Sequence, residues 1–163
     1  MSESPKPLSA MSTLRDDRYF EDYPVGAVYE FGPIEVEEAE VIAFASRFDP
    51  QAMHIDPAAA AAGPFKGLIA SGWHTLSLMM RLMVDNYLST VAGLASPGVD
   101  EVRWVRPVRP GDRLTLRTTI LEARPSRSKP DRGVIFGLME GVNQNGEVVA
   151  SYRGMNLILK RPG

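Results

Sequence analysis

The sequence predicts an α+β domain in which an antiparallel sheet curls around one long apolar helix. The most hydrophobic stretch of the chain, GLIASGWHTLSLMMRLMVDNYL at 67–88, has the length of a helix and carries apolar residues on most of its sides. After residue 98 the pattern changes to alternation in segments separated by turn residues, which is typical of strands. A sheet and a helix of this kind would each bury the apolar face of the other.

A short extended piece and a helix are expected in the first third of the chain. The extended piece is VYEF at 28–31, which lies between two glycines. The helix spans 36–48 (VEEAEVIAFASRF), because acidic residues at its start suit the positive end of the helix dipole and apolar residues recur at helical spacing. It should end at Asp49, since the residue before a proline avoids the helical region.

A short alanine-rich helix is expected next, in DPAAAAAGPF at 56–65. Asp56 is the expected N-cap, Pro57 occupies the first helical position, and Gly63 with Pro64 ends the helix. We therefore interpret Asp56 as a capping residue rather than as an acid of a functional site.

The long helix is expected over 72–88 and should be buried on most sides. An apolar stripe and further apolar residues beside it make the apolar arc wider than that of an ordinary surface helix. The stripe consists of Trp73, Leu76, Met80, Val84 and Tyr87, and Leu78, Met79, Leu82 and Met83 lie beside it.

Four strands are expected in the second half of the chain. They lie at 99–108, 112–123, 134–142 and 147–160. A Pro-Gly turn separates the first two, and the last two should pair as a hairpin across 143–146.

Length and composition limit the class of protein. At 163 residues, 44% of them apolar, the chain suits one domain at 16–163, preceded by a flexible tail at 1–15 that is rich in Ser, Pro and charge. There is no cysteine, which excludes disulfides, thiolate nucleophiles and zinc–thiolate sites. A net charge of −2 and a pI near 5.7 argue against a general nucleic-acid binder.

The sequence also gives no sign of a membrane or a metal. No stretch reaches the roughly 18–20 apolar residues of a membrane span, and the N-terminus lacks the apolar segment of a signal peptide. We therefore expect a cytoplasmic protein without a membrane partner. His54 and His74 are the two histidines and no metal site is expected from them; His74 is interpreted as a core or interface histidine bonded to backbone.

The stretch FDPQAMHIDP at 48–57 is the strongest candidate for a functional site. Asp49 and His54 stand in a largely apolar neighbourhood, and such a pair can hold a water molecule and move its proton. On the pattern alone a structural interpretation remains open. In that interpretation Asp49 caps the turn before Pro50, and His54 is a partly buried histidine whose hydrogen bonds are satisfied.

The longer stretch FDPQAMHIDPAAAAAGPFKGLIASG resembles the hydratase motif of MaoC-like dehydratases and R-specific enoyl-CoA hydratases. The spacing from Asp to His and the distance from His to the long helix both agree with that motif. The later stretch RPVRPGDRLTL resembles a strand of the same family, so the resemblance covers nearly the whole chain.

The resemblance implies a hot dog fold, in which a sheet wraps a central helix, and a homodimer or higher homo-oligomer without a cofactor. It also implies an acyl thioester of coenzyme A as substrate and reversible addition of water across its C2–C3 double bond. By position, Asp49 and His54 match the catalytic pair, and Gly72 matches the glycine whose backbone N–H holds the thioester oxygen. The chain departs from the motif at Gln51 and Ala52, which replace Asn and Pro.

Further substrate contacts are expected along the long helix. Ser71 and Trp73 flank Gly72, and Trp73 and Met80 are expected to line the acyl pocket. Met80 stands where related hydratases carry a serine, which signals a different acyl group. Gly72 also has a structural interpretation, as a glycine that allows close packing where the helix begins.

Positive charge gathers in the strand region. Nine basic residues lie between positions 103 and 132, against three acidic ones. Guanidinium groups suit phosphates, and coenzyme A carries several. Arg127, Lys129 and Arg132 are therefore expected to contact its nucleotide end, directly or across a dimer interface. The alternative is that these side chains are solvated on strand faces.

Two other classes of function remain open. An acyl-CoA thioesterase would hydrolyse the thioester, but it more often uses a carboxylate on the central helix, where the one acid here is Asp85 near the far end. A non-catalytic acyl-CoA-binding subunit would keep the fold and the basic residues. The presence of Asp49, His54 and Gly72 together counts against that second class.

Overall fold

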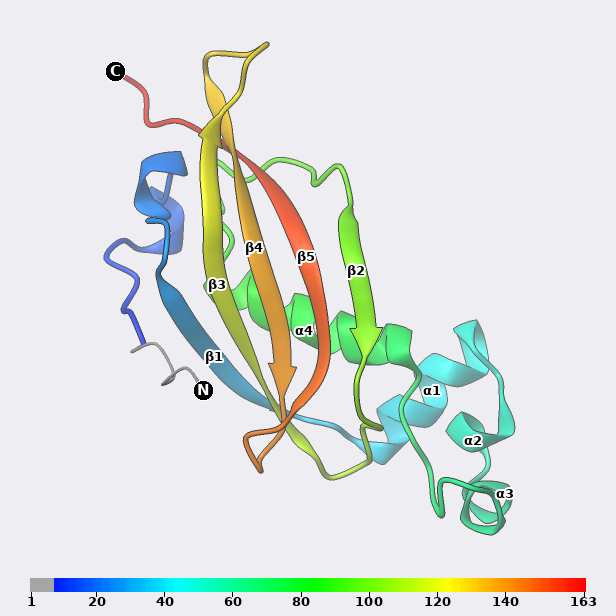
Figure 1. Cartoon of the computed structure of the whole chain (residues 1–163). Coiled ribbons are helices and arrows are strands. Elements are labelled where there is room, and N and C mark those ends of the chain that lie inside the picture. The colour runs from blue at the N-terminus through cyan, green and yellow to red at the C-terminus, as the bar shows by residue number, and fades with distance from the viewer. Residues whose placement is uncertain (1–7) are drawn as a thin grey trace.

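Five antiparallel strands form one curved sheet in the computed structural model, which describes residues 8–163. The strands are β1 (Val28–Glu35), β2 (Val99–Trp104), β3 (Arg113–Pro125), β4 (Arg132–Val142) and β5 (Val148–Leu159). Their order across the sheet is β1-β3-β4-β5-β2, so β1 and β2 are the two edges. The expected α+β architecture is confirmed, and Figure 1 shows the sheet bending across the long helix α4.

The long helix α4 (Gly72–Asn86) provides one half of the core. Four of its buried side chains, Leu78, Met79, Leu82 and Met83, pack against the inward-facing residues of the sheet. On β3 these alternate as expected, and Leu114, Leu116 and Ile120 are each at most 1% exposed. Full burial of one such side chain contributes about 1.5–3 kcal/mol, so the contact between α4 and the sheet stabilises the fold. The hot dog arrangement is thereby confirmed.

The expectation that α4 is buried on most sides is wrong. Trp73, Met80 and Val84, three members of the predicted stripe, are 60%, 45% and 41% exposed. The sheet covers one face of the helix only, and that face is the one occupied by Leu78 and Met79. Because both faces are apolar, the sequence pattern does not indicate which of them meets the sheet.

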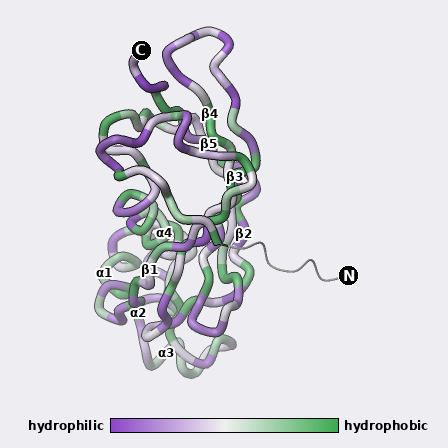
Figure 2. The backbone as a smooth tube through the Cα atoms, turned by 90° about the vertical axis from the view of Figure 1, so that its left-hand side faces the viewer, coloured by the Kyte–Doolittle hydropathy of each residue, from purple (hydrophilic) through white to green (hydrophobic). Residues whose placement is uncertain are grey.

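Three short helices gather at one end of the molecule, while the connection between β3 and β4 lies at the other end (Figures 1 and 2). They are α1 (Glu38–Phe48), α2 (Ala52–Ile55) and α3 (Pro57–Ala62). Helix α2 was not expected. Asp56 caps α3 as predicted, because its carboxylate accepts a hydrogen bond from the Ala59 N–H at 3.0 Å.

Three strands run further than their sequence patterns suggest, whereas the strand expected at 99–108 ends at Trp104, because the chain after it leaves the sheet and lines a pocket. β1 continues past the VYEF segment, and β3 and β4 extend into the polar connection, which shrinks to 126–131. The hairpin between β4 and β5 is confirmed, and Gly146 in its turn has a φ of +76°, which favours glycine. Figure 2 shows hydrophobic and hydrophilic residues alternating along these strands.

The segment before β1 closes the C-terminal end of α4. It forms two turns of 3₁₀ helix, Arg15–Asp17 and Phe20–Asp22. Between them the buried guanidinium of Arg18 donates to the carbonyl oxygens of Asn86 at 2.8 Å and Tyr87 at 2.9 Å. A cation at this position satisfies carbonyls that the helix leaves without partners and complements the helix dipole.

The packed part of the chain begins before the boundary predicted at residue 16. The Ser9 N–H donates to the Val28 carbonyl at 2.6 Å, and Met11 packs against the core. Residues 8–15 therefore contact the domain, whereas residues 1–7 of the predicted flexible tail lie outside the described part of the chain.

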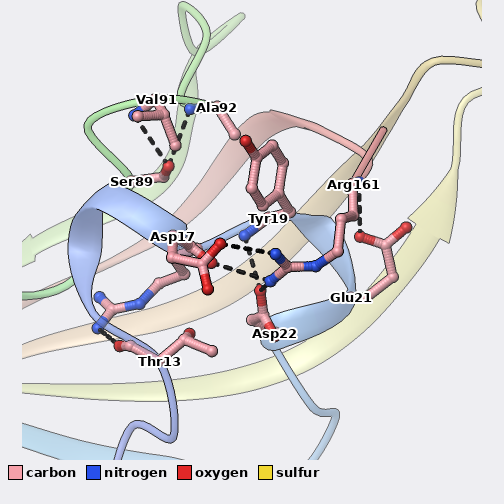
Figure 3. A network of polar contacts seen from close by, with 10 residues as sticks. Thr13, Asp17, Tyr19, Glu21, Asp22, Ser89, Val91, Ala92 and Arg161 are labelled. Carbon is pink, nitrogen blue, oxygen red and sulfur yellow. Dashed lines mark hydrogen bonds and ion pairs between the residues drawn. The ribbon is translucent and has the colours of Figure 1, made fainter. Parts of the chain in front are cut away.

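The chain that follows β5 is fastened to the two 3₁₀ turns (Figure 3). The Arg161 guanidinium pairs with Asp17 at 2.7 Å and with Asp22 at 2.8 Å, and it lies 4.7 Å from the centre of the Tyr19 ring. The Arg161 N–H also donates to Glu21 at 3.0 Å. Within residues 8–163, no helix has the length and hydrophobicity needed to cross a membrane.

Candidate active site

Asp49 and His54 are brought together by the end of α1 and the single turn of α2. The Asp49 N–H donates to the Ala45 carbonyl at 2.8 Å, which ends α1 and fixes the direction of the aspartate. His54 lies in α2, three residues after Gln51, and its backbone N–H donates to the Gln51 carbonyl at 2.9 Å. The two side chains converge, with 3.4 Å between His54 Nε2 and Asp49 Oδ2.

The Asp49 carboxylate accepts two further hydrogen bonds. The Gln51 amide donates to Oδ1 at 2.7 Å, and the Ser71 hydroxyl donates to Oδ2 at 2.7 Å. Gln51, then Ser71, and to a smaller extent the nearby His54 imidazole hold the pKa of Asp49 below its ordinary value, although burial acts in the opposite direction. Asp49 is therefore a carboxylate at neutral pH.

The hydrogen bonding of His54 fixes its neutral tautomer. Nδ1 lies 2.6 Å from the Ile69 carbonyl oxygen, and because a carbonyl can only accept, Nδ1 must carry the proton. The lone pair of a neutral His54 is then on Nε2, beside Asp49. The imidazole is 5% exposed, so this orientation is held by the surrounding protein.

The segment before α4 brings Gly72 to the same place. The Ile69 N–H donates to the Met53 carbonyl at 3.1 Å, and the Ala70 N–H donates to the Val108 carbonyl at 2.7 Å. Gly72 follows as the first residue of α4, where a backbone N–H has no partner within the helix.

Trp104 at the end of β2 lies directly against Gly72. A Cβ at position 72 would stand 2.3 Å from Trp104 Cε2, so no other residue fits without displacing the indole. Trp73 meets the same indole edge to face, with 5.3 Å between ring centres. The close-packing interpretation of Gly72 is thus correct, and it is compatible with a role for the backbone N–H.

These residues line one pocket of about 430 Å³. Asp49, His54, Gly72 and Trp73 all contribute to it, together with Trp104. The remaining walls are mostly apolar and include Met53, Phe65, Ile69, Val105, Pro107 and Val108. An ionised carboxylate, an imidazole whose Nδ1–H is held by a carbonyl, and a helix N-terminus thus face an apolar chamber, an arrangement suited to acid–base chemistry on a largely apolar ligand.

Comparison with known proteins identifies the family. The profile of the MaoC like domain matches residues 21–135, well over half of the chain. The chain belongs to the MaoC-like family of hydratases and dehydratases.

Three related proteins are similar to this chain. A MaoC-like dehydratase from Rhodospirillum rubrum, known from its crystal structure, superposes with a TM-score of 0.82 and 39% identity over 90% of this chain and 99% of the other. The uncharacterised protein YdeM of Bacillus subtilis is 28% identical over 86% of this chain and 98% of its own. The 3-hydroxyacyl-thioester dehydratase Z of Mycobacterium tuberculosis is 37% identical over 54% of this chain and 60% of its own.

Two residues expected near the substrate have other surroundings in this MaoC-like chain. The fully buried Ser71 does not line the pocket but holds Asp49 through its hydroxyl. Met80, two turns further along α4, lines a separate hollow beside Leu94 and Asn156. Within one chain, Met80 and the Asp49–His54 pair therefore do not share a pocket.

The basic loop also lies apart from the pocket. Arg127 and Lys129 lie in the connection between β3 and β4, and Arg132 begins β4, at the end of the sheet opposite to α1, α2 and α3 (Figure 1). Arg132 is engaged with its neighbour Asp131 at 2.8 Å. Contact between this loop and a ligand in the pocket of the same chain is not supported.

Sequence reasoning missed the wall formed by residues 104–108. Trp104, Val105, Arg106, Pro107 and Val108 all line the pocket, although they follow α4 by nearly twenty residues. The signal was the resemblance of RPVRPGD to a family strand. That resemblance indicated a strand in this region, but it did not show that residues 104–108 lie against the start of α4.

His74 is buried as expected but has a different partner. Its Nε2 lies 3.0 Å from the Glu40 carboxylate of α1, not from backbone, and its ring stacks on Phe44 with 4.9 Å between centres. It ties α1 to α4 outside the pocket. Among residues 8–163, no three His, Asp or Glu side chains are grouped so as to hold a metal ion.

Proposed function

We propose that this chain is a hydro-lyase that adds water to, or removes it from, the C2–C3 bond of a 2-enoyl-CoA thioester. The observation that carries the proposal is the Asp49–His54 pair, with its ionised carboxylate and its tautomer fixed by Ile69. Membership of the MaoC-like family and the name of the mycobacterial relative support the reaction class.

His54 is the general base of the proposed hydration. Its Nε2 lone pair takes a proton from a water held between Nε2 and Asp49 while the water oxygen bonds to C3. The resulting imidazolium lies beside the Asp49 carboxylate, which stabilises its charge without taking the proton. The same Nε2–H then donates to C2, so that one water molecule is added in all, and dehydration follows these steps in reverse.

Gly72 stabilises the negative charge that develops on the thioester oxygen. Its N–H heads α4, where the helix dipole adds partial positive charge, and it shares the pocket with His54. Loss of one such donor in other enzymes costs about 2.7–4 kcal/mol in the transition state.

Nothing favours the thioesterase alternative. The one acid of α4, Asp85, is exposed, and it pairs with Arg81 at 2.9 Å in the last part of the helix, away from the pocket. The carboxylate of the central helix that a thioesterase more often uses would have to line the pocket, and Asp85 does not.

The test is an assay of purified protein on trans-2-enoyl-CoA thioesters of increasing chain length. Loss of the conjugated-thioester absorbance is followed in one cuvette and thiol release in another. We expect absorbance loss without thiol release, reduced by about 10²–10⁴ in Asp49→Asn and in His54→Ala.

Asp85→Asn is the matched control, because it makes the same chemical change on an acid far from the pocket. It should retain wild-type hydration. Thiol release by the wild type would assign the protein to the thioesterases, and ligand binding without turnover of any thioester would support a binding subunit.

The proposal includes a homodimer. The exposed apolar residues of α4, Met80 and Val84 among them, are accompanied by the edge strand β2. Val99 and Trp104 on this strand, and Val105 directly after it, are 49%, 47% and 56% exposed. A second copy placed here would cover both features and lie beside the pocket.

A further inference from the structure

The rim of the pocket carries a positive charge that the proposed chemistry does not use. Arg106 lines the pocket, and its side chain is 56% exposed, whereas that of His54 is 6% exposed. The hydrating pair is therefore deep and the arginine is at the opening. The Arg106 backbone is fixed, since its N–H donates to the Val149 carbonyl at 3.2 Å.

A second cation, Lys66, follows directly after a residue that lines the same pocket as Arg106. Phe65 lines the pocket, and Lys66 follows it with a left-handed φ of +59°. Arg109 holds this loop, because its guanidinium donates to the carbonyls of Phe65 at 2.5 Å and Leu68 at 3.4 Å. Within residues 8–163, no carboxylate lies within 4.0 Å of the Lys66 amine.

In the described part of the chain Arg106 pairs with one carboxylate, and an anionic ligand can take the place of that carboxylate. The Arg106 Nε lies 3.0 Å from Glu147 Oε2, and the two side chains are 56% and 38% exposed. An ion pair with this exposure contributes little to stability, so an incoming anion can replace the glutamate. A phosphate suits the planar guanidinium better than a single carboxylate oxygen does.

We propose that Arg106 and Lys66 form the site for the phosphate that follows the pantetheine arm of the thioester substrate. This inference rests on the proposed function, which supplies a thioester at the bottom of the pocket. Unlike Arg127, Lys129 and Arg132, which lie at the other end of the sheet, Arg106 lines the pocket of the same chain. Coenzyme A and the phosphopantetheine of a carrier protein share this chemistry.

The kinetic test compares two thioesters with the same acyl group, one on coenzyme A and one on N-acetylcysteamine, which has no phosphate. The ratio of their kcat/KM values isolates the contribution of the phosphates. We expect Arg106→Ala to lower this ratio about three- to tenfold, mainly through KM for the coenzyme A thioester. Glu147→Gln removes the competing acid and should raise the ratio.

Arg153→Ala is the matched control. Arg153 forms a similar exposed pair, in which its Nε lies 3.0 Å from Glu101 Oε2, but it lies on the sheet outside this pocket. A ratio in Arg106→Ala equal to that in Arg153→Ala would overturn the proposal. A ratio of kcat/KM values that falls in Arg132→Ala but not in Arg106→Ala would also overturn it.

An equilibrium measurement separates this proposal from the reaction itself. The only two tryptophans, Trp73 and Trp104, both line the pocket, so intrinsic fluorescence reports its occupation. Free coenzyme A, 4′-phosphopantetheine and pantetheine are titrated into the wild type and into Arg106→Ala. We expect the two phosphate-bearing ligands to bind more tightly than pantetheine, and the difference to shrink in the variant.

The outcomes are distinct. Phosphate-dependent binding without turnover would refute the hydro-lyase and support the phosphate site. Turnover with equal affinity for pantetheine and coenzyme A would support the hydro-lyase and refute the phosphate site. If 4′-phosphopantetheine gains as much as coenzyme A, the phosphate shared with carrier proteins is the one bound. A gain confined to coenzyme A would place its nucleotide end at Arg106 and overturn the site as stated.

Discussion

At the scale of single residues, the hydrogen bonds around Asp49 decide what this carboxylate can do. Gln51 and Ser71 each donate to one of its oxygens at 2.7 Å, which stabilises the ionised form. A carboxylate of lowered pKa is a poor base but a good partner for an imidazolium, and this is why the proposed mechanism assigns the proton to His54.

Removing the Ser71 hydroxyl should move the acid limb of the pH profile of kcat/KM. In Ser71→Ala the ionised carboxylate loses a donor, so the pKa of Asp49 rises and activity declines at a higher pH than in the wild type. Gln51→Ala should act in the same direction. The measurement is kcat/KM for one enoyl thioester from pH 8 down to below pH 3.8, the ordinary pKa of an aspartate, because the wild-type limb lies under that value.

Ser77→Ala serves as the control for this shift. Ser77 is an exposed serine of α4 whose hydroxyl donates to the Trp73 carbonyl, so the same chemical change is made without touching Asp49. An acid limb that stays in place in both Ser71→Ala and Gln51→Ala would show that Asp49 does not control it.

At the scale of the elements, the sequence predicted the secondary structure of the segments better than their tertiary contacts. Periodicity located α1, α4 and the hairpin of β4 and β5, and the order Asp56-Pro57 located the start of α3. The apolar arc of α4 was read correctly as wide, but its width concealed which side meets the sheet. Likewise, the contact between Trp104 and Gly72 joins segments far apart in the chain, and no local pattern reports it.

The same distinction applies to the site. The proximity of Asp49 and His54 was predictable because their spacing belongs to one continuous motif. The role of Ser71 as a donor to Asp49, 22 residues away in the sequence, depends on the path of the loop before α4. Arg106 was one arginine among nine basic residues in its region, and only the fold shows that it lies at the pocket while Arg132 does not.

A charge on the outer face of α4 should separate the proposed dimer. Val84→Asp places a carboxylate on the surface that a second copy would cover, and burial of an unpaired charge is costly. We expect the variant to sediment as a monomer at concentrations where the wild type is a dimer, with its helical content retained. Sedimentation velocity and circular dichroism make these two measurements.

Val25→Asp is the comparison for this experiment. Val25 is a 61% exposed valine in the turn before β1, so it tests the effect of an added charge outside the proposed interface. The dimer proposal fails if the wild type sediments as a monomer, or if both variants dissociate equally.

At the scale of the whole molecule, buried tyrosines tie the stability of the core to pH. Burial raises the pKa of Tyr23 to about 12 and that of Tyr152 to about 12, and it also raises the pKa of Tyr87. In the unfolded chain these phenols ionise near pH 10. Their contribution to stability is therefore complete below pH 10 and is lost as the pH rises towards 12.

The free energy of unfolding should fall in this range by about 3 kcal/mol for each fully titrated tyrosine. Tyr152→Phe removes one of these groups. Within residues 8–163 the one hydrogen-bond partner of the Tyr152 hydroxyl is the Met83 sulfur, at 3.6 Å, so the variant should match the wild type at pH 8. Urea unfolding at pH 8, 10 and 11 should show a smaller loss in the variant. Equal losses in the two proteins would contradict this origin.

The ion pairs of Arg161 with Asp17 and Asp22 limit the order in which the contacts of the fold can form during synthesis. Asp17 and Asp22 leave the ribosome early, but their partner Arg161 follows Asp17 by 144 positions and Asp22 by 139. The C-terminal carbonyls of α4 can be covered by Arg18 much sooner, over 68 positions. The nascent chain can thus form α4 and its contacts with Arg18 first, and the ion pairs of Arg161 form only after β5 has emerged and joined the sheet.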